Sequence, residues 1–260
     1  MPRKTTIQWR IGCSGFHYKE WKEVFYPRGL PQRKWFDHYC EHFDTLELNV
    51  TFYRFPEISS LQNWYKKSPP HFLFAVKAPR LITHYKKFED CRSLLTDFYT
   101  TIRDGLQEKL GCVLFQLPPG LSYTPALLTR ITSQLDPSFN NVVEFRHSSW
   151  WNEEVYKVLA AHHISFCGIS HPRLPDRPIG NTDVVYYRFH GVPRLYYSGY
   201  SDDFLDTLVA DITGFAGVKQ AFLYFNNTAD VVAIANAQYL QARLLEQPGQ
   251  NLMGTMYPIK

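Results

Sequence analysis

The stretch Asn141-Val-Val-Glu-Phe-Arg-His-Ser-Ser-Trp-Trp151 decides the interpretation of the whole chain. In an extended segment, Glu144 and Arg146 lie on one side of the strand. Val143 and Phe145 lie on the other side, so the charged and the apolar groups are separated. A helical pattern follows after a short turn. Because α/β enzymes present reactive groups where a strand ends and a helix begins, we expect the functional site to be centred here.

Eight short apolar segments occur along the chain, and helical patterns separate most of them. The predicted strands are residues 7–13, 45–49, 72–78, 112–117, 142–146, 164–169, 184–190 and 221–226. Residues 171–182 are rich in Pro, Arg and Gly and predict no helix. The pattern predicts an α/β fold, a (β/α)8 TIM barrel that occupies residues 1–260 as a single domain, with the crossover helix after the sixth strand missing or short. A doubly wound open sheet is the alternative, although no Gly-x-Gly-x-x-Gly turn supports a nucleotide-binding form of it.

The composition is that of a globular protein with one large core. The 260 residues are 45% hydrophobic, and 28 Lys and Arg against 24 Asp and Glu give a formal net charge of +4. This balance permits a local basic patch but does not by itself predict a polyanionic partner. Five widely spaced cysteines favour reduced, buried thiols and a cytoplasmic location. The first residues lack the apolar run of a secretion signal, and no segment approaches the roughly 20 apolar residues of a membrane span, so we expect no membrane association.

Polar side chains gather in the later half of the predicted strands. If the apolar side of each strand faces the helices, the opposite side points into the barrel. The residues expected to point inward are Glu47, Asn49, Lys77, Gln116, Glu144, Arg146, Arg188, His190, Tyr224 and Asn226. They lie toward the carboxyl ends of their strands, where TIM barrels carry their active sites. Burial of so many polar groups is costly unless they pair with one another or surround a ligand.

Two interpretations of this set remain open. In the first, the two glutamates and the three cations form a closed salt-bridge network that only fills the end of the barrel. In the second, three cations against two carboxylates leave a positive site for a phosphate or carboxylate, with arginine as the planar clamp. On the second interpretation, Glu144 and Glu47 are the expected general acid/base pair and His190 is the expected proton shuttle near neutral pH. The expected ligand-binding residues are Lys77, Arg146, Arg188, Asn49, Gln116, Arg80, Trp150, Tyr53 and Asn226.

Aromatic residues follow several of the predicted strands. Phe52 and Tyr53 follow the second strand, and Trp150 and Trp151 follow the fifth. Beside Arg80, such rings predict a stacking surface for bases or sugars. Hydrophobic lids that anchor the long loops are the alternative explanation.

A metal centre is not predicted at this end of the barrel. The candidate ligands are Glu47, Glu144, His84, His147 and His190. No His-x-His or His-Glu-x-x-His spacing appears, and the neighbouring Lys and Arg side chains oppose a cation. We therefore expect no catalytic metal and no other cofactor.

Seven motifs, most of them at strand ends, resemble the YecE-like family. They are Ile11-Gly-Cys-Ser-Gly-Phe-His-Tyr18, Leu46-Glu-Leu-Asn49, Phe74-Ala-Val-Lys-Ala-Pro-Arg80, Leu114-Phe-Gln-Leu-Pro-Pro119, Glu144-Phe-Arg-His-Ser-Ser-Trp150, Tyr187-Arg-Phe-His-Gly191 and Tyr224-Phe-Asn-Asn227. The resemblance covers about residues 7–245 and implies a TIM barrel. The family is catalogued as a domain of unknown function, so the resemblance implies no activity.

Three functional hypotheses follow. The main one is an enzyme that uses acid/base chemistry on a phosphate-bearing ligand, such as a nucleotide, a nucleic acid or a sugar phosphate, at the carboxyl end of the barrel. The second is a non-catalytic module that binds nucleic acid or a nucleotide through the same cations. The third is a metal-independent sugar-phosphate lyase or isomerase that uses Lys77 as an amine, which requires a desolvated lysine with a lowered pKa. The sequence predicts no oligomeric state.

Overall fold

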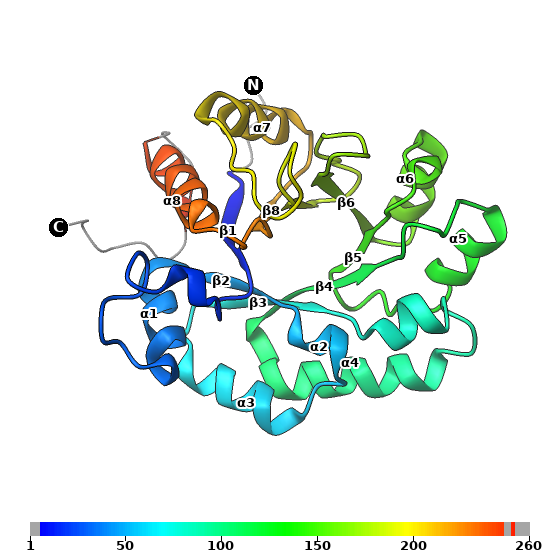
Figure 1. The fold of residues 1–260 in the computed structure, drawn as a ribbon. Helices are drawn as coiled ribbons and strands as arrows, with labels where there is room; N and C mark the ends of the chain where they lie inside the picture. The colour runs from blue at the N-terminus through cyan, green and yellow to red at the C-terminus, as the bar shows by residue number, and fades with distance from the viewer. Residues whose placement is uncertain (1–5, 247–250, 253–260) are drawn as a thin grey trace.

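Eight parallel strands form a closed barrel at the centre of the molecule (Figure 1). The computed structural model describes residues 6–246 and 251–252. The strands are β1 (Gln8–Ser14), β2 (Thr45–Leu48), β3 (Leu73–Lys77), β4 (Leu110–Gln116), β5 (Asn141–Glu144), β6 (Ile164–Ser170), β7 (Val184–Phe189) and β8 (Gln220–Phe225). Because β1 pairs with both β8 and β2, the sheet closes on itself. The predicted (β/α)8 barrel is confirmed, and the open-sheet alternative is wrong.

Except for the short α2, which lies beside the carboxyl end of β3, the helices pack around the outside of the barrel (Figure 1). They are α1 (Trp35–His42), α2 (Val50–Tyr53), α3 (Ile58–Lys67), α4 (Arg92–Leu106), α5 (Pro125–Thr132), α6 (Glu153–Ala161), α7 (Asp202–Gly214) and α8 (Val232–Leu245). The segment between β6 and β7, which the structure describes throughout, contains no helix, as predicted. Pro172, Pro175 and Pro178 interrupt that segment and prevent a continuous helical ladder. Within the described ranges, no helix combines the length and the apolar character that crossing a bilayer would require.

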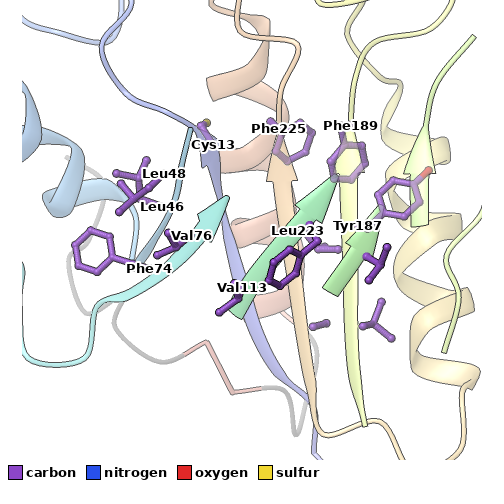
Figure 2. Packing of buried hydrophobic residues seen from close by; sticks show 14 of the residues in the cluster. Cys13, Leu46, Leu48, Phe74, Val76, Val113, Tyr187, Phe189, Leu223 and Phe225 are labelled. Atoms are coloured by element: carbon purple, nitrogen blue, oxygen red, sulfur yellow. The ribbon is translucent and has the colours of Figure 1, made fainter. Parts of the chain in front are cut away.

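Alternation of side chains along the strands produces two apolar layers. The outer layer fills the space between strands and helices, and Leu46, Phe74 and Val76 belong to it (Figure 2). The inner layer fills the barrel itself. It consists of Ala75, Cys112, Leu114, Val142, Cys167, Ile169, Val184, Tyr186, Phe222 and Tyr224. The predicted separation of an apolar outer side from an inner side that becomes polar toward the carboxyl end is therefore confirmed.

Three local elements differ from the prediction. Helix α2 and a π-helical turn (Leu81–Tyr85) occupy segments that were expected to be loops. Thr51 fixes α2 in place, because its hydroxyl donates a hydrogen bond to the carbonyl oxygen of Lys77 at 2.6 Å. A short ninth strand, β9 (Asn251–Leu252), pairs with β1 at Gln8 and Trp9, and its sequence carried no signal for this pairing.

All five cysteines lie within the described residues as free thiols. Cys13, Cys112 and Cys167 are fully buried in the two apolar layers. Burial raises the pKa of each of these three thiols, so they remain protonated and pack as apolar groups. This agrees with the sequence prediction of buried, unpaired thiols.

Gly12 in β1 occupies a position without room for a side chain. A Cβ atom there would lie 2.3 Å from the carbonyl oxygen of Thr45 and 2.9 Å from the hydroxyl of Tyr39. That hydroxyl accepts a hydrogen bond from the Cys13 amide at 2.8 Å and donates one to Thr45 at 3.0 Å. The junction of β1 and β2, where the barrel closes, therefore requires a glycine.

The variant Gly12→Ala is expected to lower the free energy of unfolding by at least about 2 kcal/mol, because the added methyl group meets backbone rather than a mobile side chain. Urea denaturation checks the value. Gly214→Ala at the end of α7 is the control, because a Cβ there meets nothing within 4 Å and the change is expected to be neutral or slightly stabilising. Equal effects of the two substitutions would contradict the explanation.

Candidate functional site

Arg188 is the centre of a buried ionic network at the carboxyl end of the barrel. Its Nη1 donates to Glu144 Oε2 at 2.6 Å, and its Nη2 donates to Glu47 Oε1 at 2.6 Å. All three side chains are at most 1% exposed. Glu47, Glu144 and Arg188 come from β2, β5 and β7, so the closed barrel brings together residues that are far apart in the sequence. This convergence follows the inward direction predicted for all three.

Two further side chains complete the environment of Glu47. The Ser14 hydroxyl donates to Glu47 Oε1 at 2.7 Å, and the Tyr186 hydroxyl donates to Oε2 at 2.6 Å. Burial raises the pKa of Tyr186 well above its ordinary value, so it stays a neutral donor. Neither residue was predicted to belong to the site. Both have the inward parity, Ser14 as the last residue of β1 and Tyr186 two residues before Arg188, and this parity was the available signal.

A second branch of the network runs from Glu144 to Asn226. Strand β5 ends at Glu144, two residues earlier than predicted, so Arg146 lies in the turn that follows. The Nε atom of Arg146 donates a hydrogen bond to Glu144 Oε1. Arg146 Nη2 donates to His190 Nε2 at 3.0 Å. The Asn226 amide lies 2.8 Å from His190 Nδ1. A neutral imidazole has one acceptor nitrogen and one donor nitrogen, so His190 can accept from Arg146 Nη2 or from Asn226 Nδ2 but not from both.

The charge states of this network are fixed by its surroundings. Burial acts to raise the pKa of Glu144, but Arg146 and Arg188 hold it well below its ordinary value. Burial acts to lower the pKa of Arg188, and Glu47 and Glu144 raise it well above its ordinary value. Burial and the charge of Arg146 hold the pKa of His190 well below its ordinary value. Glu144 is therefore a fixed anion and His190 a fixed neutral ring near pH 7, which does not favour the proton-transfer roles expected for them.

Lys77, the last residue of β3, remains outside this network. Its side chain is 9% exposed, and among the described residues its Nζ makes no hydrogen bond or ion pair. The amine lies 4.2 Å from the centre of the Phe52 ring. Burial, and then the charge of Arg188, lower the pKa of Lys77 from 10.5 to about 7. The first interpretation, a closed network of all five charges, is therefore correct for four of them and wrong for Lys77.

Polar groups without full partners surround the end of β3. Asn49 directly follows β2. Leu48 is in register with Val76, so the next residues along the two strands, Asn49 and Lys77, lie side by side. The Oδ1 atom of Asn49 is buried and has no hydrogen-bond partner in the described chain. The Gln116 amide donates to the Leu117 carbonyl at 2.8 Å. Among the described residues, Asn49 Oδ1 is therefore an unpaired acceptor at this end of the barrel.

Two histidines lie near these groups. His84 Nε2 is 3.5 Å from Gln116 Nε2, and burial followed by the charge of Lys77 lowers the pKa of His84. His171, which follows β6, has a ring centre 6.0 Å from that of His190. Its pKa is lowered by burial and by Arg146. His171 was not predicted; its position directly after a strand, in the segment without a helix, was the available signal.

An exposed basic and aromatic rim lies beyond this polar layer. The guanidinium of Arg80 lies 5.7 Å from the ring centre of Tyr53 and 5.4 Å from that of Tyr85. Tyr53 is 69% exposed and Tyr85 is 63% exposed, so both rings face solvent. The expected placement of Arg80 and Tyr53 together at the surface agrees with this geometry.

Trp150 has a packing role instead of a place in this rim. Its ring is fully buried and stacks on Phe145, with ring centres 4.0 Å apart. Its Nε1 donates to the Leu121 carbonyl at 2.8 Å. The sequence placed Trp150 among the ligand-binding residues because it follows a strand, but the outward parity of Phe145 draws the indole into the outer apolar layer.

The candidate metal ligands at this end of the barrel do not form a cluster within the part of the chain that the structure describes. In the described part of the chain, no three His, Cys, Asp or Glu ligand atoms from Glu47, Glu144, His84, His147 and His190 come close enough together to share an ion. Arginines occupy both carboxylates instead. The chemistry that the arrangement offers is an amine beside a set of fixed charges.

Comparison with known proteins places the chain in one family. The family described as "Protein of unknown function DUF72" matches residues 10–257. A crystal structure of a DUF72 family protein from Thermotoga maritima is 31% identical, with a TM-score of 0.83, and the match covers 92% of this chain and 100% of that one. A DUF72 family protein from Enterococcus faecalis V583 is 19% identical, with a TM-score of 0.77 and coverage of 94% and 100%.

A curated relative is similar over a shorter region. The UPF0759 protein YunF of Bacillus subtilis is 28% identical over 155 residues, which are 56% of this chain and 54% of YunF. The match therefore spans about half the length of that relative. These names state no activity, and the expected membership in a TIM-barrel family of unknown function is confirmed at this level.

Glu144→Gln is expected to lower the free energy of unfolding by roughly 3–5 kcal/mol, because it leaves Arg146 without its carboxylate partner and Arg188 with Glu47 alone. Urea denaturation measures the loss. Glu89→Gln removes the partner of Arg130 in an exposed ion pair and is the matched control, with an expected loss of at most about 1 kcal/mol. If both variants lost the same small amount, the buried network would not stabilise the barrel end.

Lys77→Met is expected to stabilise the protein more at pH 6.5 than at pH 9, by a difference of about 2 kcal/mol. The folded state buries a charged amine below pH 7, and this cost disappears as the pH rises from about 7 to 10.5. Urea denaturation at the two pH values measures it. Lys66→Met on the exposed surface of α3 is the control, expected to change stability by at most about 0.5 kcal/mol. A gain for Lys77→Met that is the same at both pH values would contradict the lowered pKa.

Proposed function

We propose, from the premise that the chain belongs to the DUF72 family of proteins of unknown function, that it is an enzyme acting on a small phosphate-bearing carbonyl compound. Lys77 is the proposed nucleophile. The observation that supports this most is the buried amine without an ion pair or hydrogen bond among the described residues, whose pKa is lowered to about 7. Of the activities considered, this favours a metal-independent lyase or isomerase.

A lysine with a pKa near 7 is suited to imine chemistry. A substantial fraction of its amine is neutral at physiological pH, so its lone pair is free to attack a carbonyl carbon. The carbonyl oxygen leaves as water with one proton from the amine and one from solvent, which forms a protonated imine. The imine then accepts the electron pair of an adjacent C–H bond, whose proton passes to water, or of a C–C bond, whose other fragment leaves as a carbonyl compound. This chemistry needs no metal and no organic cofactor. Free thiols throughout the described chain favour action in the cytoplasm.

The substrate's anionic group is proposed to lie between Lys77 and the rim. Arg146 is 11% exposed, and its guanidinium is already fixed in place by Glu144 and His190. Arg80 at the exposed rim supplies a second guanidinium. Two arginines favour a phosphate group, because guanidinium donors pair with its oxygens in a fixed geometry. Asn49 and Gln116 are the proposed partners for hydroxyl groups of the substrate.

The other predicted catalytic residues are proposed to act by holding charge in place. Glu47 and Glu144 keep Arg188 and Arg146 fixed, and these two cations help to lower the pKa of Lys77. His190 contacts the guanidinium of Arg146 through Nε2, and the Asn226 amide contacts the other ring nitrogen of His190. In this proposal, the Lys77 amine carries out the chemistry. Glu47 and Glu144 fix the positions of the charges around it instead of acting as a general acid/base pair.

The amine is expected to be trapped covalently. Incubation with a panel of carbonyl phosphates, such as dihydroxyacetone phosphate and ribose 5-phosphate, followed by sodium borohydride, is expected to add the mass of one reduced adduct at Lys77. Peptide mass spectrometry locates it. Lys77→Met is expected to abolish the adduct.

Lys109→Met is the matched control for this experiment. Lys109 is also buried, but its Nζ donates three hydrogen bonds, to the Tyr65 carbonyl and to the carbonyl and hydroxyl of Ser68. Three donated bonds require all three N–H groups of the ammonium form, which has no lone pair to attack a carbonyl. The adduct is therefore expected to persist in Lys109→Met. Modification spread evenly over surface lysines, or none with any compound of the panel, would argue against the proposal.

A nucleic-acid-binding role is the second candidate. The exposed Tyr53 and Tyr85 rings beside Arg80, and Arg194 at 4.0 Å from the ring centre of Tyr197, favour it, because aromatic and basic side chains together bind single strands. Salt-sensitive oligonucleotide binding that Arg80→Ala removes and Lys77→Met leaves intact would support this role in place of the enzyme.

A further inference from the structure

Helix α1 carries two histidines and a glutamate on one face. His38, Glu41 and His42 stand at positions i, i+3 and i+4, which are neighbours on an α-helix surface. Helix α1 leads into the amino end of β2, whereas Lys77 lies at the carboxyl end of β3, so the two groups lie at opposite ends of the barrel. The spacing His-x-x-Glu-His is visible in the sequence, but nothing in the barrel mechanism uses it.

The three side chains bring their ligand atoms together. One nitrogen of each histidine and one oxygen of Glu41 all lie within 4.8 Å of one another. His38 Nδ1 is 3.4 Å from Glu41 Oε2, close to the separation of two ligands on a tetrahedral ion with bonds of about 2.0–2.1 Å. Glu41 is 67% exposed, so its side chain is free to rotate and close the remaining distance.

A backbone contact orients His38 for this role. Its Nε2 lies 2.9 Å from the carbonyl oxygen of Phe25, which accepts only, so Nε2 carries a proton and donates it. Nδ1 then presents a lone pair toward the Glu41 carboxylate, which is also an acceptor. A metal ion between the two atoms would be bound by both. Histidine ligands in metal sites are commonly fixed by such a hydrogen bond from the other ring nitrogen.

We propose that His38, Glu41 and His42 bind a divalent transition-metal ion of the zinc type. Two imidazoles and one carboxylate suit Zn²⁺ better than Mg²⁺ or Ca²⁺, which prefer oxygen ligands alone. Three protein ligands leave a fourth position for water or an external group. The Phe25 ring packs against both imidazoles, at 5.1 and 5.2 Å between ring centres, and so restricts the orientation of the two rings.

Zinc binding by the full chain, purified without a histidine tag and freed of metal with EDTA, tests this site. Calorimetric titration with zinc chloride is expected to show one ion per chain. Glu41→Gln and His42→Gln are expected to raise the dissociation constant roughly tenfold or more. Cobalt substitution is expected to give visible d–d absorption that both variants lose. Because Glu41 is exposed, its variant keeps the fold even if the His42 variant does not.

His162→Gln is the matched control, since His162 is an exposed histidine at the end of α6 with a neighbouring histidine. It is expected to leave the zinc affinity unchanged. Absence of saturable zinc binding, or equal affinity in the wild type, Glu41→Gln and His42→Gln, would overturn the proposal. Neither result depends on the reactivity of Lys77.

Discussion

Arg188 lies between the carboxylates of Glu47 and Glu144, and its two ion pairs allow both carboxylates to be buried at one end of the barrel. A carboxylate taken out of water costs several kcal/mol unless an opposite charge and hydrogen bonds replace its hydration. The remaining oxygen positions are filled by Ser14 and Tyr186 on one side and by Arg146 on the other. Strands β1, β2, β5 and β7 are thus joined by charge as well as by their backbone ladders.

This network sets the properties of the amine beside it. The two carboxylates already bond to arginines, so the burial of Lys77 and the positive charges of Arg188 and Arg146 outweigh their attraction for its ammonium form. The lowered pKa of Lys77 is therefore a property of the whole assembly rather than of one contact. An amine that loses its proton near pH 7, held beside fixed cations, is the arrangement on which the proposed covalent chemistry depends.

The barrel shows why the fold and the family do not by themselves identify the function. Barrels of this architecture carry many unrelated activities, because the strands and helices form a framework on which the residues at the carboxyl end vary. The two DUF72 relatives share the architecture over 92% and 94% of this chain. The proposed chemistry depends on Lys77 and its neighbours. The cluster on α1 shows that candidate functional groups also lie outside the carboxyl end of the barrel.

The order of strands, the barrel and the segment without a helix after β6 were determined by the sequence, because apolar periodicity and proline positions are local properties of the chain. The same periodicity placed Glu47, Lys77, Glu144, Arg188 and His190 on the inner side. Only the tertiary structure decided which of them pair. Arg146 reaches back to Glu144, Arg188 spans two carboxylates, Lys77 is left over and Trp150 packs outward. These outcomes depend on the register between distant strands and on side-chain length, and the resulting burial then sets each pKa. Residue order along the chain does not specify those distances.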